Sequence, residues 1–324
     1  MQKKVLVTGG AGYIGSILVR LLLERGYYVR VVDNLLFGGE SLLGLLNRRD
    51  FEFIRADVRD DKVMQKAVEG MDYVVHLAAI VGDPACAAQP DLAQEVNLTA
   101  TKKLFELCNA ADVERFVFAS TCSNYGKMPD PNAYVDETSE LRPVSLYART
   151  KVESERYLLS SLQAQTIPVI LRFATVYGIS YRMRFDLTVN EFTRELAMGN
   201  ELIVYGEQFW RPYTHVVDLA RSVVLALEAK KQDVAFEVFN VGDTSENYRK
   251  KDIIELLLHY FPNARIKYVV RTEDPRDYRV SFEKIRQKLG YKITFRVKDG
   301  IEQIKYALET GLISNPYEKK YRNV

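Results

Sequence analysis

Short apolar runs alternate with longer segments of helical periodicity over the first half of the chain. Residues 4–8 are a β-branched run that stops at glycines, and residues 14–25 then repeat apolar side chains at the spacing of one helix face. The predicted strands cover residues 4–8, 28–32, 51–54, 73–77, 115–119 and 168–173, and the predicted long helices cover residues 14–25, 92–110 and 146–162. Alternating strands and helices predict an α/β fold with a doubly wound parallel sheet and right-handed crossovers.

After Gly178 the pattern loosens and predicts shorter elements. The predicted helices cover residues 189–198, 217–229, 252–260 and 298–308, and the predicted strands cover residues 202–205 and 237–241. We expect residues 179–324 to form mainly a smaller α/β lobe that closes over a ligand. It is interwoven with residues 1–178 because no flexible linker separates the two, and a strand near residues 236–242 is expected to return to the first sheet.

Composition and charge exclude several classes of protein. The 324 residues are 47% hydrophobic and 27% charged, which is typical of a folded chain. Lys and Arg number 45 against 43 Asp and Glu, so a net charge of +2 disfavours nucleic acid as a main partner. The cysteines Cys86, Cys108 and Cys122 are too few and scattered for a disulfide framework or a metal site, which favours the cytoplasm. No apolar run approaches the roughly 20 residues of a membrane helix, and the N-terminus lacks a secretory signal pattern.

A glycine-rich turn joins the first predicted strand to the first predicted helix. It runs from Thr8 to Gly15 and places Gly9 and Gly12 at the junction. Glycines there permit a close approach of a pyrophosphate, and the helix N-terminus supplies unpaired N–H groups. Asp33 ends the second predicted strand, where a carboxylate binds ribose hydroxyls and repels a 2′-phosphate. Either feature alone is typical of an ordinary turn or strand cap, but together they predict a Rossmann-type site for NAD rather than NADP.

Tyr147 and Lys151 are four residues apart in the predicted helix of residues 146–162, so both side chains lie on one helix face. A phenol has an ordinary pKa of about 10, and a nearby cation favours its phenolate. Tyr147 is therefore a candidate acid/base. The alternative is a solvated helix face, which the spacing taken alone favours.

Further motifs follow in order along the chain. They are Asp57-Val58, His76-Leu77-Ala78-Ala79, Asn97, Ser120-Thr121, Tyr125-Gly126, Leu171-Arg172-Phe173, Val176-Tyr177-Gly178, and the segments 211–216 and 274–278. With the glycine-rich turn, Asp33, Tyr147 and Lys151, they resemble the extended short-chain dehydrogenase/reductases, specifically the NAD-dependent nucleotide-sugar epimerase/dehydratase family. The resemblance covers nearly the whole chain.

This resemblance implies a set of cofactor contacts. Its members follow the carboxyl ends of the predicted strands or lie on the helices beside them. They are Gly9, Gly12, Tyr13 and Ile14 at the pyrophosphate, Asp33 at the adenine-side ribose, Asp57 and Val58 beside adenine, Leu77, Ala78 and Ala79 toward the nicotinamide, and Gly15, Asn34, Asn97, Ser120, Tyr147, Lys151, Phe173 and Val176 elsewhere along NAD.

The resemblance also implies the catalytic and substrate residues. Tyr147 and Lys151 would be catalytic, with Lys151 also binding the nicotinamide ribose, and Thr121 would hydrogen-bond to the reacting sugar oxygen. Arg211 and Arg276 would hold the diphosphate of a nucleotide sugar, because guanidinium groups suit phosphate oxygens. The other expected substrate contacts are Cys122, Ser123 and Arg184.

The two positions after Thr121 depart from one branch of the family. The family's 4,6-dehydratases carry an Asp-Glu pair there, which supplies the acid and base of an elimination. Here the positions hold Cys122 and Ser123. Serine has no useful basicity and a thiol has an ordinary pKa of about 8.5, so we expect no 4,6-dehydration. Cys122 could have a chemical role, as a nucleophile or an acid. We favour the alternative that it is a small polarizable residue that fills the sugar pocket.

Residues 81–86 and 180–187 resemble, more loosely, a branch that includes bacterial GDP-heptose 4-dehydrogenases. Arg182 and Arg184 in the second segment either bind a diphosphate or an acidic sugar group, or are structural. His215 is expected to be a structural histidine at a helix start.

We therefore expect a Rossmann-type NAD domain over residues 1–178 and a substrate lobe mainly over residues 179–324. The enzyme would oxidise the 4-position of a nucleoside-diphosphate sugar, as a 4-epimerase or a 4-dehydrogenase, without a metal. The alternatives are a 4,6-dehydratase or reductase and, from another class, a non-catalytic NAD-binding regulator. The resemblance also implies a homodimer that pairs through the helices of residues 92–110 and 146–162.

Overall fold

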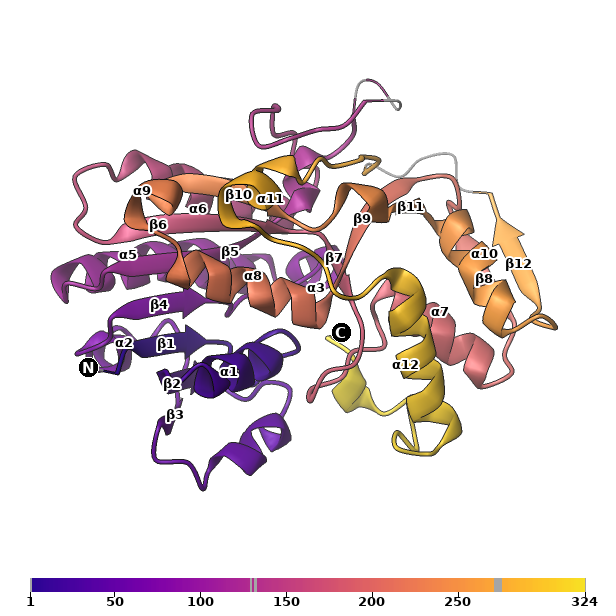
Figure 1. The fold of residues 1–324 in the computed structure, drawn as a ribbon, viewed down its shortest axis with the longest axis horizontal. Coiled ribbons are helices and arrows are strands. Elements are labelled where there is room, and N and C mark those ends of the chain that lie inside the picture. The colour runs from indigo at the N-terminus through magenta and orange to yellow at the C-terminus, as the bar shows by residue number, and fades with distance from the viewer. Residues whose placement is uncertain (1, 129, 131–132, 271–275, 324) are drawn as a thin grey trace.

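The computed structural model describes residues 2–128, 130, 133–270 and 276–323, so Asp274 and Pro275 of one expected motif lie outside the described residues. Its centre is a seven-stranded sheet of order β10-β6-β5-β4-β1-β2-β3, in which every neighbouring pair is parallel (Figure 1). The strands are β1 (Lys4–Thr8), β2 (Tyr28–Asp33), β3 (Phe51–Arg55), β4 (Tyr73–His76), β5 (Arg115–Thr121), β6 (Ile167–Phe173) and β10 (Glu237–Val241). The doubly wound parallel sheet is confirmed, and its strand order reverses beside β1, where ligands bind in such sheets.

Successive residues of the central strands point to opposite faces, so the sheet carries two apolar cores. On one face Val5 and Val7 of β1 pack with α1 (Gly15–Glu24) and α8 (Val216–Glu228). On the other face Leu6 packs in a second cluster, built on α2 (Asp61–Val68), α5 (Ala100–Ala110) and the end of α6 (Leu146–Ser160). Burial on both faces is the reason that inner strands such as β1 and β4 are apolar runs, whereas β2 and β3 toward the edge of the sheet include Arg30 and Glu52.

A smaller α/β lobe lies beside the carboxyl ends of the sheet strands (Figure 1). It holds a three-stranded sheet of order β11-β9-β7 and a two-stranded sheet of β12 and β8. Its elements are β7 (Thr175–Tyr177), α7 (Thr188–Ala197), β8 (Leu202–Tyr205), β9 (Trp210–His215), β11 (Asn247–Arg249), α10 (Lys250–Tyr260), β12 (Ile266–Val269) and α12 (Val297–Glu309). The four expected helices after Gly178 and the strand of residues 202–205 are confirmed. The sequence did not predict β7 and β11, which have only three residues each, or β9 and β12, which lack an uninterrupted apolar run.

The helix expected over residues 92–110 is interrupted. It consists of α4 (Pro90–Gln94), a π-helical turn (Glu95–Thr99) and α5. Asn97 lies in that turn, and its side-chain amide accepts a hydrogen bond from the Ile80 nitrogen (2.8 Å) and donates one to the Ile80 oxygen (3.0 Å). The wider turn brings the Asn97 amide to the loop after β4, which is typical of π-turns near functional sites.

The chain returns to the first sheet after entering the second lobe. Helix α8 packs against α1, and β10 then pairs with β6 at the edge of the sheet. The C-terminal end of the chain lies in the middle of the molecule, between the sheet and α12 (Figure 1).

The remaining elements are short. They are α3 (Asp83–Ala88), α9 (Lys231–Val234), α11 (Glu283–Leu289) and the 3₁₀ turns Glu40–Leu45, Cys122–Tyr125, Thr244–Glu246 and Lys319–Tyr321. None of the helices in the described ranges is long and apolar enough to cross a membrane.

Candidate active site

A cavity of about 920 Å³ opens at the carboxyl ends of the central strands and is lined by both lobes. Most of the expected site residues line it. These are Gly9, Gly12, Tyr13, Ile14, Gly15, Asp33, Asn34, Asp57, Val58, Leu77, Ala78, Ala79, Ser120, Thr121, Ser123, Tyr147, Lys151, Phe173, Val176, Arg184 and Arg276. We call the part formed by Gly9, Gly12, Asp33 and Asp57 the glycine end, and the part formed by Ser123, Tyr147, Arg276 and Tyr278 the tyrosine end.

The glycine end has the shape that a pyrophosphate needs. Gly9 has a φ of +74°, and a Cβ there would lie 2.8 Å from the Ala78 nitrogen. A Cβ on Gly15 would lie 2.7 Å from the Gly10 Cα. Helix α1 therefore begins directly behind a turn that has no room for side chains at Gly9 and Gly15. Because Gly12 and Gly15 line the cavity, the unpaired N–H groups at the start of the helix are available to a bound anion.

Asp33 lies at the end of β2 and is held by backbone donors. Its Oδ2 accepts a hydrogen bond from the Ala11 nitrogen (3.0 Å), and its Oδ1 accepts one from the Leu35 nitrogen (2.8 Å). Each carboxylate oxygen keeps a further lone pair for a ribose hydroxyl. Burial raises the pKa of Asp33 above its ordinary value. The closely packed glycines of the turn and this carboxylate together fit NAD.

Helix α6 carries the two expected catalytic residues in its first two turns. Ser145 caps the helix by accepting a hydrogen bond from the Ala148 nitrogen (3.2 Å). The Lys151 side chain is buried and donates a hydrogen bond from Nζ to the Ala119 oxygen (2.8 Å). Burial lowers the pKa of Lys151 to about 8, and burial raises the pKa of Tyr147 above its ordinary value. Tyr147 therefore needs a positive charge near its phenol, such as that of Lys151, to act as a base near neutral pH.

Thr121 is the last residue of β5 and lies where that strand meets the cavity. Its Oγ1 accepts a hydrogen bond from the Ser123 nitrogen (3.1 Å), which fixes the side chain at the start of the 3₁₀ turn. The Ser123 hydroxyl accepts a long hydrogen bond from Tyr278 OH (3.4 Å), and both of these residues line the tyrosine end.

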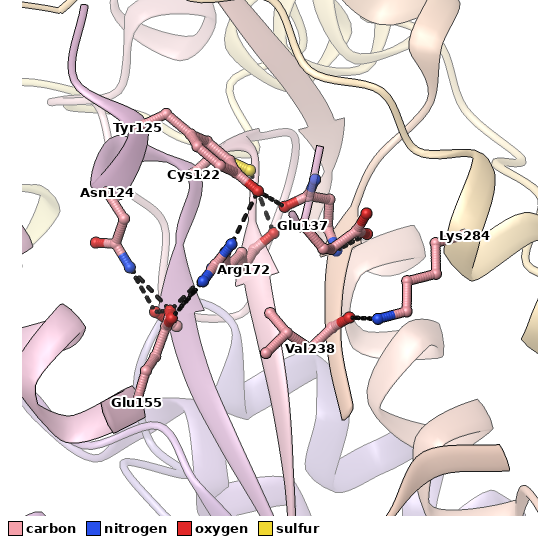
Figure 2. Close-up of polar contacts among 10 residues, drawn as sticks. Cys122, Asn124, Tyr125, Glu137, Glu155, Arg172, Val238 and Lys284 are labelled. Carbon is pink, nitrogen blue, oxygen red and sulfur yellow. Dashed lines mark hydrogen bonds and ion pairs between the residues drawn. The ribbon is translucent and has the colours of Figure 1, made fainter. Parts of the chain in front are cut away.

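A buried ion pair holds these elements together beneath the cavity (Figure 2). Glu155 lies one turn after Lys151 on α6 and accepts a hydrogen bond from the Arg172 Nη2 of β6 at 2.6 Å. The Glu155 and Arg172 side chains are only 2% and 5% exposed. Glu155 also accepts hydrogen bonds from Ser120 and from Asn124 (2.8 Å), which lie on either side of Thr121. Sequence reasoning missed Glu155; its signal is a carboxylate four residues after Lys151.

The network continues from Arg172 toward the edge strand β10. Arg172 donates to the Tyr125 hydroxyl (3.0 Å), which in turn donates to the Asn240 Oδ1 (2.7 Å). The Asn240 nitrogen donates to the Glu137 carboxylate (2.7 Å), and Figure 2 shows the hydrogen bonds that link Glu155, Arg172 and Tyr125. The ends of β5, β6 and β10 are thus fixed relative to α6.

Three expected site residues do not line the cavity. The Cys122 thiol is buried and donates a hydrogen bond to the Arg172 oxygen (3.3 Å), and burial raises its pKa above the ordinary value. Asn97 holds the loop after β4, as described above. Arg211 donates to the Trp210 oxygen (2.6 Å), and its guanidinium lies 5.3 Å from the centre of the Tyr278 ring.

The cavity is also lined by Asp83, Asp186 and Arg182, of which the sequence analysis considered only Arg182 as a ligand contact. Asp83 forms an ion pair with Arg276 (3.1 Å), which links the loop after β4 to the second lobe. Asp186 accepts two hydrogen bonds from the Arg184 guanidinium, at 3.0 and 2.7 Å. Arg182 lies in the same wall. The signal for Arg182 and Asp186 is the alternation of charged and apolar residues over positions 182–186.

His215 has the structural position that was expected. It is the N-cap of α8, where its Nδ1 accepts a hydrogen bond from the Val217 nitrogen (3.3 Å), and its Nε2 pairs with Gln303 (3.0 Å). Among the residues that the structure describes, no group of three His, Cys, Asp or Glu side chains could hold a metal ion.

Residues 5–242 match the model of the NAD dependent epimerase/dehydratase family. The chain belongs to this family. The family resemblance and the NAD cofactor expected from the sequence are both confirmed, and the chain is an enzyme of the extended short-chain dehydrogenase/reductase type.

Curated relatives cover nearly the same length. The chain is 29% identical to the UDP-glucose 4-epimerase of Halalkalibacterium halodurans over 310 residues, which are 89% of this chain and 90% of that protein. It is 31% identical to a dTDP-glucose 4,6-dehydratase of an Actinoplanes species over 316 residues, which are 93% of this chain and 96% of that protein.

Solved structures of UDP-glucose 4-epimerases have the same fold. The Thermotoga maritima enzyme with UDP-glucose superposes with a TM-score of 0.85 at 29% identity, covering 95% of this chain and 99% of that one. The Thermus thermophilus enzyme in complex with NAD superposes with a TM-score of 0.81 at 29% identity, covering 94% and 98%.

Proposed function

We propose that this enzyme oxidises the 4-position of a nucleoside-diphosphate sugar with NAD, as a 4-epimerase or a 4-dehydrogenase. The observation that carries the proposal is one cavity lined by Thr121, Tyr147 and Lys151 together with the glycine-rich turn, while the Cys122 thiol faces the protein core. Residues 1–178 would bind NAD, and residues 179–324 would mainly bind the sugar nucleotide.

The chemistry divides between the cofactor and the residues of the cavity. NAD⁺, when bound, supplies the acceptor for the hydride from the sugar carbon. Tyr147 takes the proton of the 4-hydroxyl, and Lys151 supplies a positive charge that favours the phenolate. Thr121 hydrogen-bonds to the same sugar oxygen. The product of this step is a 4-keto sugar held between the two lobes.

An elimination of water lacks its acid and base. Cys122 lies outside the cavity, and the neighbouring Ser123 has no useful basicity. Asp83, which follows β4, is a carboxylate in the cavity wall that could replace the missing acid or base, but it is paired with Arg276. A 4,6-dehydratase therefore fits less well, although one relative bears that name. A non-catalytic regulator fits less well still, because such a protein has no physical need for Thr121, Tyr147 and Lys151 in one cavity.

The substrate contacts follow from charge and position. The relative from Thermotoga maritima was solved with UDP-glucose, which supports a diphosphate-linked sugar as the ligand. Ser123, Arg184 and Arg276 line the cavity and would contact this substrate, with the two guanidinium groups near its phosphates. The epimerase and the dehydrogenase differ only in whether the keto sugar is reduced again before its release.

Product analysis tests this proposal. The purified enzyme is incubated with NAD⁺ and, separately, with UDP-, dTDP- and GDP-hexoses, while NADH fluorescence and product masses are followed. A 4-epimer of unchanged mass, or a 4-keto sugar with accumulating NADH, is the expected product. A 4-keto-6-deoxy sugar, recognised by the loss of water, would contradict the proposal, and no reaction with any sugar nucleotide would favour the regulator.

We further propose that the enzyme works in the cytoplasm as a homodimer. Helices α5 and α6 contact each other on one face of the sheet, where the family commonly pairs its subunits. Light scattering on the purified protein measures its mass in solution, and a monomer at micromolar concentration would contradict the dimer.

A further inference from the structure

The C-terminal segment, residues 315–323, runs from the end of α12 back to the cavity. The Phe185 nitrogen donates a hydrogen bond to the Tyr321 oxygen (2.8 Å), and the two rings lie edge to face with centres 5.7 Å apart. The Asn323 nitrogen donates to the Asp186 carboxylate (3.2 Å). Asn323 itself lines the cavity, so the end of the chain is part of the cavity wall.

Arg182 is the side chain that this segment holds. Its Nη1 donates to the Asn323 Oδ1 (2.7 Å), and its Nη2 donates to the Arg322 oxygen (3.1 Å). The guanidinium lies 4.3 Å from the centre of the Phe37 ring. Packing and two hydrogen bonds therefore fix the guanidinium in one position.

The charge of Arg182 is not neutralised by these contacts. Arg182 is 7% exposed, the acceptors of its two hydrogen bonds are uncharged oxygens, and within the described part of the chain no atom accepts a hydrogen bond from its Nε. The neighbouring Arg184 is paired with Asp186, so that carboxylate is already shared. Burial and the nearby Arg184 lower the pKa of Arg182 to about 10, while the charges of Asp186 and Asp33 act in the opposite direction, so Arg182 stays charged at neutral pH. A buried cation with a free donor is strongly stabilised by an anion.

Arg182 lies beside the glycine end. The segment that carries it packs against the glycine-rich turn, since Tyr13 OH donates to the Gly178 oxygen (2.5 Å) and the hydroxyls of Ser16 and Ser180 are 3.0 Å apart. Phe37, which Arg182 contacts, follows Asp33 by four residues and lines the same cavity. The anion that reaches this position is therefore the diphosphate of the dinucleotide rather than that of the sugar nucleotide.

We propose that Arg182 binds the pyrophosphate of NAD and that the C-terminal segment, through Asn323 and the Arg322 carbonyl, holds Arg182 in place and slows the dissociation of NAD. This inference goes beyond the proposed reaction and rests only on the binding of NAD. Slow dissociation keeps the cofactor in the cavity between successive turnovers.

Dissociation rates of the cofactor test the role of the C-terminal segment. The enzyme is loaded with NADH and chased with excess NAD⁺, and the loss of bound-NADH fluorescence gives the dissociation rate. We expect Asn323→Ala and Arg182→Gln each to raise the rate by about tenfold, the loss of one charge-assisted contact. The double variant should be little faster than Arg182→Gln alone, because both changes remove the same contact. Lys320→Ala is the matched control, since Lys320 is exposed and contacts Glu318 (2.8 Å) and the Tyr321 ring in the same segment but not Arg182 or Asn323.

Nucleotide fragments test which anion Arg182 binds. Calorimetry should show that Arg182→Gln weakens ADP binding by about tenfold and leaves the affinities for adenosine and UDP unchanged. A loss of UDP affinity instead would assign Arg182 to the sugar nucleotide and overturn the proposal. An unchanged NADH dissociation rate in Asn323→Ala would also overturn it, and that variant decides the matter if thermal melting shows that Arg182→Gln does not fold.

Discussion

At the glycine end the lining residues directly follow the sheet strands, whereas at the tyrosine end they come from segments far apart in the sequence. Gly9 follows β1, Asp33 ends β2 and Asp57 follows β3 within two residues. By contrast, of the residues that form the tyrosine end only Ser123 closely follows a sheet strand, whereas Tyr147 lies on α6 and Arg276 lies in the last fifth of the chain. The two ends of one cavity are therefore built by different means.

The difference lies in which groups hold each end. Backbone groups hold the glycine end, where the Gly9 nitrogen donates to the Val32 oxygen (2.9 Å) and the Ala11 nitrogen donates to Asp33. Side chains hold the tyrosine end, through the Asp83–Arg276 ion pair and the contact of Ser123 with Tyr278. Substitutions at the tyrosine end should therefore change the chemistry, and substitutions at the glycine end should change cofactor binding.

The largest expected effect separates the two ends directly. Tyr147→Phe keeps the ring and removes the hydroxyl, so turnover should fall by a factor on the order of 10² to 10⁴. NAD binding should be largely kept, because the glycine end is unchanged. Initial rates with the sugar nucleotide and calorimetry with NAD⁺ measure the two quantities. Near-normal turnover would mean that Tyr147 lies on a merely structural helix face.

Breaking the ion pair beneath the tyrosine end should cost stability. Glu155→Gln leaves Arg172 as a buried cation without its carboxylate, which is expected to lower the free energy of unfolding by about 3 to 5 kcal/mol. Glu309→Gln is the matched control, because its ion pair with Lys305 (2.7 Å) is half exposed and should contribute less than about 1 kcal/mol. Urea unfolding of both variants measures the difference. Equal losses would show that the pair does not support this end of the cavity.

A change of cofactor preference tests the glycine end. Asp33→Ala removes the carboxylate that would face a 2′-phosphate, so the preference of the wild-type enzyme for NAD over NADP should shrink by about tenfold or more. Calorimetric titrations of the wild-type enzyme and of Asp33→Ala, each with NAD and with NADP, measure this change. An unchanged ratio of affinities, or a wild-type preference for NADP, would remove Asp33 from the ribose site.

The smallest expected effect is a pH dependence of stability beneath the glycine end. His76 is buried and pairs with Thr8 through Nδ1 (2.7 Å) and with Thr101 through Nε2 (2.9 Å). Burial lowers the pKa of His76 to about 3. The unfolded chain, with an ordinary histidine pKa of about 6.5, therefore binds the extra proton first as the pH falls.

The free energy of unfolding should consequently decrease below pH 6.5, with a slope that approaches about 1.4 kcal/mol per pH unit for each such histidine. His215, whose pKa is also lowered by burial, contributes in the same direction. His76→Gln should remove one of the two contributions. Urea unfolding between pH 7 and pH 5 measures the slope, and an equal slope in the variant would mean that His76 is protonated in the folded enzyme.

The sequence alone predicted the parts of the molecule that depend on local spacing. The inner strands could be recognised because strands buried on both faces are apolar runs. The sequence also predicted that a strand near residues 236–242 returns to the first sheet, and the structure places this strand, β10, beside β6. The glycine end was predictable for a related reason: Gly9 directly follows β1 and Asp33 ends β2, so their positions follow from the predicted strand ends. The spacing of Tyr147 and Lys151 was visible for the same reason, as one helical turn separates them.

Only the tertiary structure decided which distant groups meet and which way a side chain points. Cys122 follows Thr121 directly, yet its thiol faces the core because a 3₁₀ turn begins there and Arg172 supplies an acceptor. Asn97 reaches Ile80 only because a π-turn interrupts its helix. The meeting of Arg182 with Asn323 joins residues 141 positions apart. No periodicity in the sequence indicates such a contact, because it depends on how two distant segments pack and not on the spacing along either segment.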